Sequence, residues 1–307
     1  MLTFIIRRIL LCIPVLFGVS FIVFMMMHLI PGDPAVIMAG EAANPEQIEQ
    51  MRHQLGLNDP VLTQYFRYIR NLLRGDMGTS IANGFPVVNE LFDVRFQTTM
   101  QLAILATIAS VSLGLLIGIV SVVWRRSFLD ILLMLVALLG LSIPNFLTGI
   151  LLMFFFAVNL DWLPVAGWGT VQHMVMPVIM LGVSGSAIIA RMTRASMIDV
   201  FNQDYIRTAY AKGASERIVV FRHALRNALI PVITVVGLQF GGLLSGAILT
   251  ETIFAINGMG RVIVLSLSTR DFPMAQGAIL VCATMFVLVN LIVDIAYRFV
   301  NKRIDVA

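Results

Sequence analysis

One serine in this 307-residue chain has the local setting of a nucleophile. Ser184 lies between Gly182 and Gly185 in an apolar stretch, where small neighbours leave its hydroxyl open to close approach. A serine attacks only when a base takes its proton. His173 is about 16 Å away if both residues lie on one helix, and the other histidines are in other segments. An intramembrane serine protease is therefore a remote alternative, and the glycines indicate close helix packing.

The lysines exclude a second kind of chemistry. A phosphate-binding loop reads Gly-x-x-x-x-Gly-Lys followed by Ser or Thr. The chain has only two lysines, Lys212 followed by Gly213 and Lys302 followed by Arg303. The chain therefore lacks an ATP-binding motif, and we expect no enzyme activity and no cofactor of its own. Any ATP-driven role requires partner subunits that bind ATP and Mg.

Ionisable residues give little support to an ion-coupled carrier, which usually holds them at mid-membrane. Asp130 and Arg191 lie at the ends of apolar runs, and Glu251 lies at the outer end of another. Asp294 has Arg298 one helical turn later, a spacing typical of a structural ion pair. No relay of charges crosses the apolar runs, so this class also stays a remote alternative.

The amino-acid composition indicates which secondary-structure elements carry these residues. The chain is 59% hydrophobic and 12% charged, whereas soluble domains carry about 25% charged residues. A bilayer crossing needs roughly 20 mostly apolar residues. Cys12 and Cys282 lie in apolar runs and form no disulfide or metal-ligand pattern. The sequence predicts an all-α membrane protein with six transmembrane helices, over residues 9–30, 99–123, 131–158, 174–191, 229–252 and 276–298.

The basic residues set the expected orientation. Fourteen of the 21 Lys and Arg residues fall on one side of the six runs, and such an excess marks the cytoplasmic side. Both termini are then cytoplasmic, and the loop 31–97 lies outside. Segment 1–30 is interpreted as an uncleaved signal anchor, because its apolar run exceeds that of a signal peptide. Residues 299–307 form a cytoplasmic tail.

The outer loop 31–97 contains two predicted amphipathic helices. Asn44, Pro45 and Gln47 supply a capping box with proline at the first helical position, and Gly56 ends that helix. A second helix begins at Asp59-Pro60 and stops at Gly75. Its apolar stripe consists of Leu62, Tyr65, Phe66, Ile69, Leu72 and Leu73. The loop lies over the membrane or against a partner, and its acidic residues form either a solvated face or a docking surface for an external protein.

The cytoplasmic loop 192–228 is the most informative stretch. Asp204 is placed to cap a short helix from Tyr205 to about Lys212, and Gly213 breaks it. Ser215 then caps a second helix with Glu216 in its first turn. A short helix with a Gly stop forms a compact knob that fits a cleft in a soluble partner. The alternative is an interfacial helix held by arginines on anionic lipid.

Two motifs in this loop carry a family resemblance. Asp204-Tyr205-Ile206-Arg207-Thr208-Ala209-Tyr210-Ala211-Lys212-Gly213, followed by His223-Ala224-Leu225-Arg226-Asn227-Ala228-Leu229-Ile230-Pro231-Val232, resembles the signature loop of ATP-binding-cassette (ABC) importer permeases, in the peptide, glutathione and nickel branch that includes dipeptide permease B. Similar pieces occur in order along nearly the whole chain. They include Ile30-Pro31-Gly32-Asp33-Pro34, Leu55-Gly56-Leu57-Asn58-Asp59-Pro60, Gly246-Ala247-Ile248-Leu249-Thr250-Glu251 and Gly258-Met259-Gly260-Arg261.

The chain departs from the general family motif at one end. Where that motif reads Glu-Ala-Ala and then Gly, this sequence has Arg207, Thr208, Ala209 and Gly213. The departure is usual for the peptide branch and supports the narrower assignment. Contacts made by the first-position Glu of other branches should not be transferred to Arg207.

The resemblance implies a type I ABC importer permease in the bacterial cytoplasmic (inner) membrane, with five helices and the coupling loop in the core 98–298. Its implied partners are a second homologous permease, two cytoplasmic ATPases, an extracytoplasmic substrate-binding protein and the lipid bilayer, with no nucleic acid. The implied ATPase-coupling residues are Asp204, Tyr205, Arg207, Thr208, Ala209, Lys212 and Gly213.

The expected cargo is small peptides, di- or oligopeptides or glutathione, with a nickel or metal-chelate importer as the alternative. The short 159–173 loop resembles the glutathione and nickel members more than dipeptide permeases with an insertion there. Four charged residues are candidates for the outer mouth of the path, and surface salt bridges are the other interpretation. They are Glu251, Arg261, Arg270 and Asp271.

Overall fold

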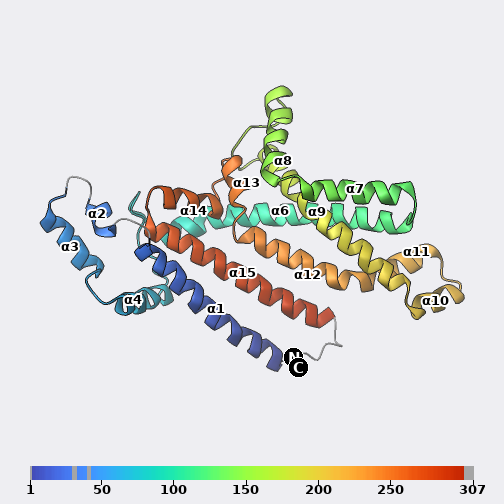
Figure 1. The fold of residues 1–307 in the computed structure, drawn as a ribbon, viewed down its shortest axis with the longest axis horizontal. Helices are drawn as coiled ribbons and strands as arrows, with labels where there is room; N and C mark the ends of the chain where they lie inside the picture. The colour runs from blue at the N-terminus through green and yellow to red at the C-terminus, as the bar shows by residue number, and fades with distance from the viewer. Residues whose placement is uncertain (1, 30–32, 40–42, 301–307) are drawn as a thin grey trace. The chain divides into compact units, whose positions relative to one another are not determined.

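The computed structural model describes residues 2–29, 33–39 and 43–300 and is helical over most of them (Figure 1). Most of the cytoplasmic tail (301–307) and the motif residues 30–32 lie outside the described residues. The contacts divide the chain into two compact units. The first unit comprises residues 1–99, 245–251 and 257–287, and the second comprises 100–244, 252–256 and 288–307.

Long apolar helices account for most of the described chain. Five continuous helical stretches are long and apolar enough to cross a membrane, and a bent pair supplies a possible sixth span. The prediction of an all-α membrane protein is confirmed. The five stretches are Ile5–Leu29, Val87–Val123, Val171–Phe201, Glu216–Leu244 and Phe272–Ile295.

The predicted third span, 131–158, is not one straight helix. Helix α7 (Phe128–Ser142) is followed by α8 (Asn145–Leu152) and a π-helical turn (Met153–Asn159), and the two parts meet at 96°. Pro144 disfavours helical geometry in the residue before it. Ile143 accordingly has an extended backbone, with φ −80° and ψ 123°. The expectation of one continuous span over 131–158 is therefore corrected to two helices joined by a sharp bend.

Two other predicted spans have different ends. The fourth, predicted as 174–191, is the helix α9 (Val171–Phe201), which runs on through the first residues of the loop. The fifth, predicted as 229–252, ends with α12 (Leu225–Leu244), and Glu251 belongs to the separate short helix α13 (Ile248–Ile253). Hydropathy marks neither helix end. Helix α12 ends although apolar residues continue past Leu244, and α9 continues as a helix although its last turns carry exposed charged residues.

Both helices predicted in the loop 31–97 are present in the first unit. Helix α3 (Pro45–Leu55) begins at Asn44 with the complete capping box, and Gly56 ends it with φ +66°. Helix α4 (Val61–Leu73) begins after Pro60. A short helix α2 (Pro34–Ala39) was not predicted. Figure 1 shows α4 beside the upper part of α1 (Leu2–Leu29).

The core of the first unit joins three segments that are distant in sequence. Val87 and Leu91, at the α5 turn (Val87–Glu90) and the π-helical turn Leu91–Arg95, are fully buried. They pack with residues of α14 (Met259–Ser268) and the start of α15 (Phe272–Val300), including Met259 and Met274. The Gln276 amide donates to the carbonyl of Val23 in α1 over 3.2 Å, which ties α1 to this core.

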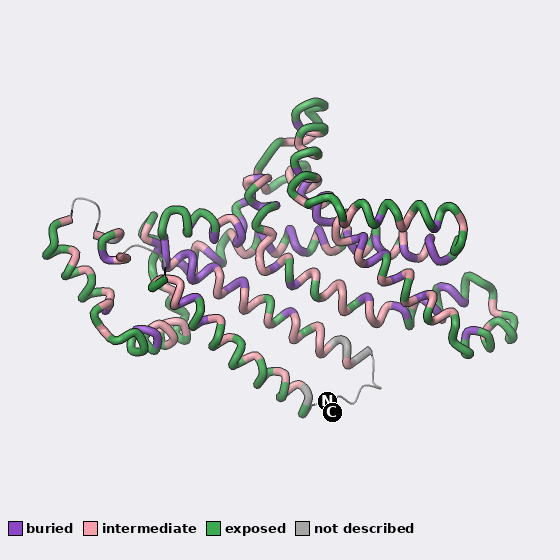
Figure 2. Tube along the Cα trace, viewed as in Figure 1, coloured by how far each residue is buried: buried purple, intermediate pink, exposed green. Residues whose placement is uncertain are grey.

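Close backbone contact holds the centre of the second unit together. A Cβ on Gly114, in α6 (Phe96–Val123), would lie 2.6 Å from the Cβ of Ile189 on α9, and one on Gly118 would lie 2.7 Å from that of Thr193. Real Cβ atoms do not approach so closely. The two glycines, one turn apart, therefore let α6 and α9 pack with backbones almost touching, as is common between membrane helices. Figure 2 shows buried residues alternating along these helices.

We predict that Gly114→Ala lowers the thermal stability of the purified chain, because overpacking a tight interface costs about 1–3 kcal/mol. Gly18→Ala in α1 is the matched control, since a Cβ there has no atom within 4 Å. The control should be neutral or stabilising, by up to about 1 kcal/mol from helix propensity. Thermal unfolding followed by circular dichroism in detergent compares them. Equal melting temperatures for the two variants would contradict the close packing.

Candidate functional site

Helix α10 (Asp204–Ala211) lies at the end of α9, next to the α11 turn (Glu216–Ile218), as Figure 1 shows. The predicted cap is wrong in detail: Gln203 is the N-cap residue, and Asp204 is the first helical residue. Its negative carboxylate still lies in the first turn, where its interaction with the positive end of the helix dipole stabilises the helix. Asp204 and Arg207 are 3.8 Å apart and almost fully exposed, so this pair contributes little to stability.

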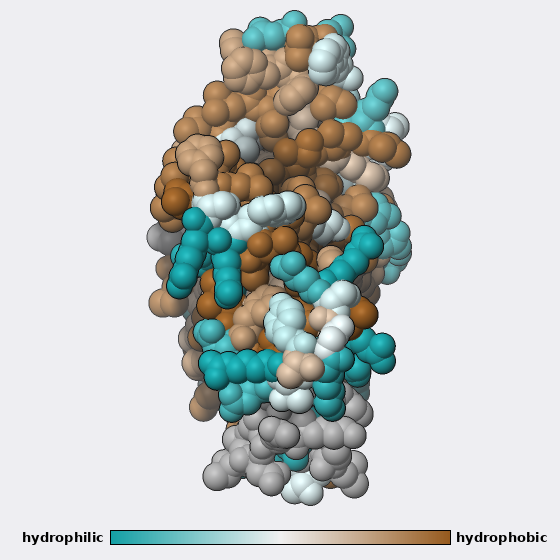
Figure 3. Space-filling model, turned by 90° about the vertical axis from the view of Figure 1, so that its right-hand side faces the viewer, coloured by the Kyte–Doolittle hydropathy of each residue, from teal (hydrophilic) through white to brown (hydrophobic). Residues whose placement is uncertain are grey.

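One side of α10 is attached to the second unit and the other is open. Ile206 is 1% exposed and is the apolar anchor of the helix. The Tyr205 hydroxyl accepts a hydrogen bond of 3.0 Å from the Asn227 amide, which also donates to the carbonyl of His223. Thr208 and Tyr210 are exposed, and Ala209 is half-buried. Figure 3 shows hydrophilic side chains gathered on the face that contains this end of the unit.

Gly213 ends α10 as predicted. Its φ of +80° lies in the left-handed region that favours glycine. Its N–H donates to the carbonyl of Tyr210 over 2.9 Å, and the N–H of Ala214 donates to Ala209 over 3.1 Å. Ser215 follows as the N-cap residue of α11, but its side chain makes no capping hydrogen bond. A left-handed glycine thus turns the chain back after two helical turns and closes the knob, here defined as residues 204–213.

A cavity of about 230 Å³ lies between the knob and the end of α6. Arg207 and Tyr210 line it from the knob, and Arg125 lines it from the α6–α7 turn. Glu216 lines it from α11. The knob therefore does not pack flat on the helices behind it.

An ion pair between a buried carboxylate and a half-buried guanidinium, not anticipated from sequence, lies in the second unit. The Arg194 guanidinium of α9 donates through both Nε and Nη2 to the Asp130 carboxylate of α7, each over 2.8 Å. Ser121 of α6 donates to the same carboxylate, as does the backbone N–H of Arg126 over 3.1 Å. Three helices are thus joined at one carboxylate. The only sequence signal was an acidic residue at the start of an apolar run, where a solvent-exposed position is the usual expectation.

Glu251, a candidate for the outer mouth, is fully buried in the first unit. Its carboxylate accepts hydrogen bonds from the Thr99 hydroxyl over 2.7 Å and from the backbone N–H of Arg261 over 2.9 Å. The Thr99 hydroxyl in turn accepts from the N–H of Met259 over 2.8 Å. Burial raises the pKa of the Glu251 carboxyl above its ordinary value, while these hydrogen bonds lower it.

These hydrogen bonds cap the N-terminal end of α14 with side chains from other segments of the chain. The first N–H groups of a helix have no partner within it, and here Thr99 and Glu251 accept from them. A Cβ on Gly258, the N-cap residue, would lie 2.4 Å from the Glu251 carboxyl carbon, so a larger residue there would push this carboxylate away from its donors. We interpret Glu251 as a structural acceptor with no surface facing a solute.

Asp271, a second candidate, is also buried. It accepts from the Ser80 hydroxyl, from the N–H groups of Ile81 and Ala82 over 3.1 and 3.3 Å, and from the N–H of Met274 over 3.3 Å. It therefore fixes the 80–82 turn and the first turn of α15. Arg261 is half-buried, with its guanidinium 3.3 Å from the Asn257 amide oxygen, and Arg270 is exposed with φ +57°. Of the four candidates for the outer mouth, Arg261 and Arg270 are the two with a side chain at the surface of the first unit.

Among the described residues, no group of three or more His, Cys, Asp or Glu side chains is placed to hold a metal ion. The distinctive features of this part of the chain are a protruding knob, a three-helix ion pair behind it and two buried carboxylates that cap helices.

Comparison with known proteins gives matches over the whole chain. Residues 110–306 match the family described as the binding-protein-dependent transport system inner membrane component, and residues 1–103 match its N-terminal family. The glutathione transport system permease protein GsiC of Escherichia coli K12 is 45% identical over 304 residues, 99% of each chain. The dipeptide transport system permease protein DppB of Alkalihalophilus pseudofirmus is 43% identical over 332 aligned positions, 99% of each.

Solved structures show the same fold at low identity. The inward-facing MetNI methionine ABC transporter matches with a TM-score of 0.56 and 16% identity, over 67% of this chain and 94% of that one. An amino acid ABC transporter with histidines matches with a TM-score of 0.51 and 15% identity, over 71% and 94%.

We predict that Thr99→Val destabilises the chain, whereas Thr99→Ser does not. Valine leaves the buried N–H of Met259 and one oxygen of Glu251 without their partner, and each such loss costs about 1–3 kcal/mol. Serine keeps the hydroxyl. Thermal unfolding of the two variants in detergent measures the difference. If valine were as stable as serine, the capping role of Thr99 and Glu251 would be wrong.

Proposed function

The chain belongs to the family of binding-protein-dependent transport system inner membrane components, and on that premise we propose that it forms, with a second homologous permease, the path by which small peptides cross the bacterial inner membrane. It is a multi-pass permease subunit of an ABC importer, with an ATPase and a binding protein as partners. The complete assembly would hold two permeases, two ATPases and one extracytoplasmic binding protein.

The observation that carries the coupling part of the proposal is the shape of the knob. Its outward side is exposed, its inward side is fastened by Ile206 and by the Tyr205–Asn227 hydrogen bond, and Gly213 closes it. A small rigid protrusion of this kind suits a cleft in a partner ATPase. The contacting residues would be Asp204, Tyr205, Arg207, Thr208, Ala209, Lys212 and Gly213.

Glutathione or a short peptide is the proposed cargo. The relatives named for glutathione and for dipeptide transport are similar in identity. The dipeptide relative aligns over 332 positions, more than the 307 residues of this chain, so that alignment contains gaps. The short 159–173 loop, which resembles that of the glutathione and nickel members, is the sequence feature that favours glutathione over dipeptides in this proposal. A nickel or metal-chelate cargo is the alternative.

For the outer mouth, Arg261 and Arg270 are the proposed charged contacts. Both lie at the surface of the first unit, whereas the carboxylates of Glu251 and Asp271 are occupied by backbone and hydroxyl donors. A cationic mouth suits cargo that carries at least one carboxylate, as peptides and glutathione do.

We predict that Gly213→Val uncouples transport in the reconstituted complex. A left-handed backbone costs a residue with a Cβ about 1–2 kcal/mol, so the knob should distort and substrate-stimulated ATP hydrolysis should fall by about tenfold. Gly213→Asn is the matched control, because asparagine tolerates the left-handed region. Both variants are first checked for assembly by size-exclusion chromatography. Unchanged stimulation in an assembled Gly213→Val complex would refute the knob as the coupling element.

The proposed orientation has its own test. With both termini cytoplasmic, a protease-cleavable tag after Ala307 should be protected in spheroplasts and cut only after the inner membrane is permeabilised. The same tag inserted after Gly84, an exposed position in the outer loop, should be cut in spheroplasts. Cleavage of the C-terminal tag by protease added outside would show that the proposed topology is wrong.

A further inference from the structure

Helix α4 has three different sides. At about 100° per residue, Gln64, Tyr65, Tyr68 and Leu72 share one side of this helix. The next side around the helix is apolar and exposed, with Leu62 65% exposed, Phe66 67% and Leu73 84%. The third side is polar, and it comprises Thr63, Arg67, Arg70, Asn71 and Arg74.

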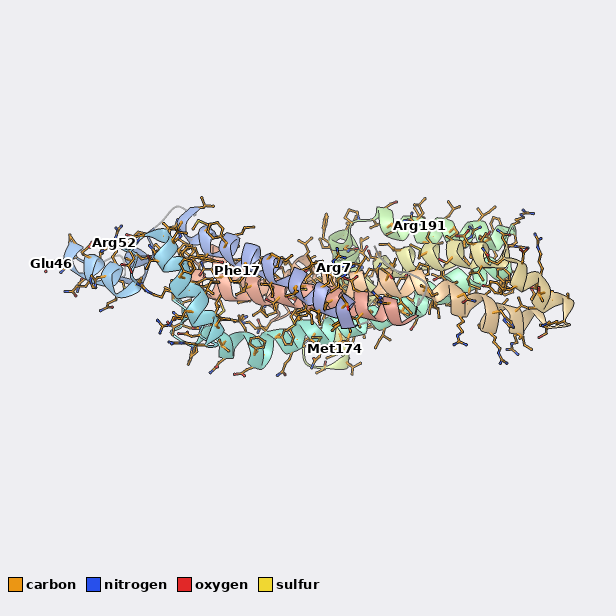
Figure 4. All side chains as sticks on the ribbon, turned by 90° about the horizontal axis from the view of Figure 1, so that it is seen from below. Arg7, Phe17, Glu46, Arg52, Met174 and Arg191 are labelled. Carbon is orange, nitrogen blue, oxygen red and sulfur yellow. The ribbon has the colours of Figure 1, made fainter. Side chains whose placement is uncertain are left out.

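The first side packs on α1. The Tyr65 hydroxyl lies 2.9 Å from the Ser20 hydroxyl and 3.3 Å from the Phe17 carbonyl oxygen. Its ring meets Phe21 edge-on at 5.3 Å and Phe24 at 5.4 Å. Both helices belong to the first unit. Figure 4 labels Phe17 on α1.

These contacts place α4 at a definite depth along a membrane span. Ser20 is about 14 Å before the Leu29 end of α1, at about 1.5 Å per residue. The apolar stretch Ile5–Leu29 has 25 residues, about 37 Å, and the hydrocarbon layer is about 30 Å thick. Even if the whole surplus projected beyond the Leu29 end, Ser20 would stay about 6 Å inside the hydrocarbon. Arg7 and Arg8 near the other end favour a deeper position.

The apolar side of α4 continues the lipid-facing surface of α1. Phe17 and Phe21 are 51% and 41% exposed, as expected for side chains that face acyl chains. Phe66 lies beside the same aromatic group, with its ring 6.2 Å from that of Tyr65. An apolar side at this depth and next to this surface meets lipid, not water.

The polar side completes the pattern. Arg67, Arg70 and Arg74 are all exposed and fall on one side of the helix. Arg67 also pairs with Asp59. Long arginine side chains reach from the interface to the phosphates of lipid headgroups. A helix with an apolar stripe between a protein contact and a basic stripe fits the boundary of a bilayer.

We propose that α4 is an interfacial membrane helix, seated in the leaflet at the Leu29 end of α1, with Leu62, Phe66 and Leu73 among the acyl chains and its arginines at anionic headgroups. The occupant of this surface is phospholipid. In the proposed orientation the leaflet is the outer one, but the depth of α4 at the Leu29 end of α1 is the same in either orientation.

The test uses nitroxide labels on the full-length chain in phosphatidylethanolamine and phosphatidylglycerol vesicles. Cys12→Ser and Cys282→Ala provide the background, and single cysteines replace Phe66 or Leu62 on the apolar side and Thr63 on the polar side. Power-saturation electron paramagnetic resonance then compares collisions with oxygen, which concentrates in lipid, and with a water-soluble nickel chelate. Circular dichroism checks that each variant keeps its helix content.

We expect oxygen collisions to exceed nickel collisions at positions 62 and 66 and the order to reverse at position 63. Ready access of nickel to Phe66 would put this side in water and overturn the proposal. Protection of Phe66 from both reagents would indicate cover by a second copy of the chain and would also overturn it. The two apolar positions guard against a single misfolded variant.

Discussion

Backbone N–H groups buried away from water need acceptors, and this constraint organises the first unit. In apolar surroundings an unsatisfied backbone group costs several kcal/mol. Helix α14 begins inside the core, so its first N–H groups are accepted by Thr99 and Glu251 from two other segments. Asp271 does the same for the 80–82 turn and for α15. Two carboxylates thus hold the broken, non-spanning part of the chain against the start of α6 and α15.

The same chemistry recurs in the second unit with a different purpose. Asp130 accepts from Arg194 and Ser121 as well as from a backbone N–H, and so connects α6, α7 and α9. Removing Arg194 would leave the buried Asp130 carboxylate without its cation, and the cost would be at most about 3–5 kcal/mol, the value typical of a fully buried pair. The Asp130–Arg194 pair lies on the part of α9 that leads to the knob. The knob itself contacts the rest of the second unit at few points, so it is a small element on a rigid base.

Some of this architecture was accessible from sequence and some was not. Hydropathy located the apolar helices, and local rules located the α3 capping box and the Gly213 stop, because these depend on residues a few positions apart. The bend at Pro144 was missed because the apolar pattern continues through it. Glu251 and Asp271 were taken for surface charges, since their acceptor roles depend on partners such as Thr99 and Ser80 that lie more than a hundred residues away. The local pattern of the knob left a soluble partner and a lipid surface as alternatives, and the proposed coupling role depends on the family resemblance.

Helix α9 runs without a break for 31 residues, from Val171 to Phe201, and the knob follows it almost directly. At about 1.5 Å per residue it is a rod about 46 Å long. A tilt of about 5° about one end displaces the other by about 4 Å. Such a rod acts as a lever. A small rotation at one membrane face becomes a displacement about as large as a side chain at the opposite face, and the helix itself does not need to bend.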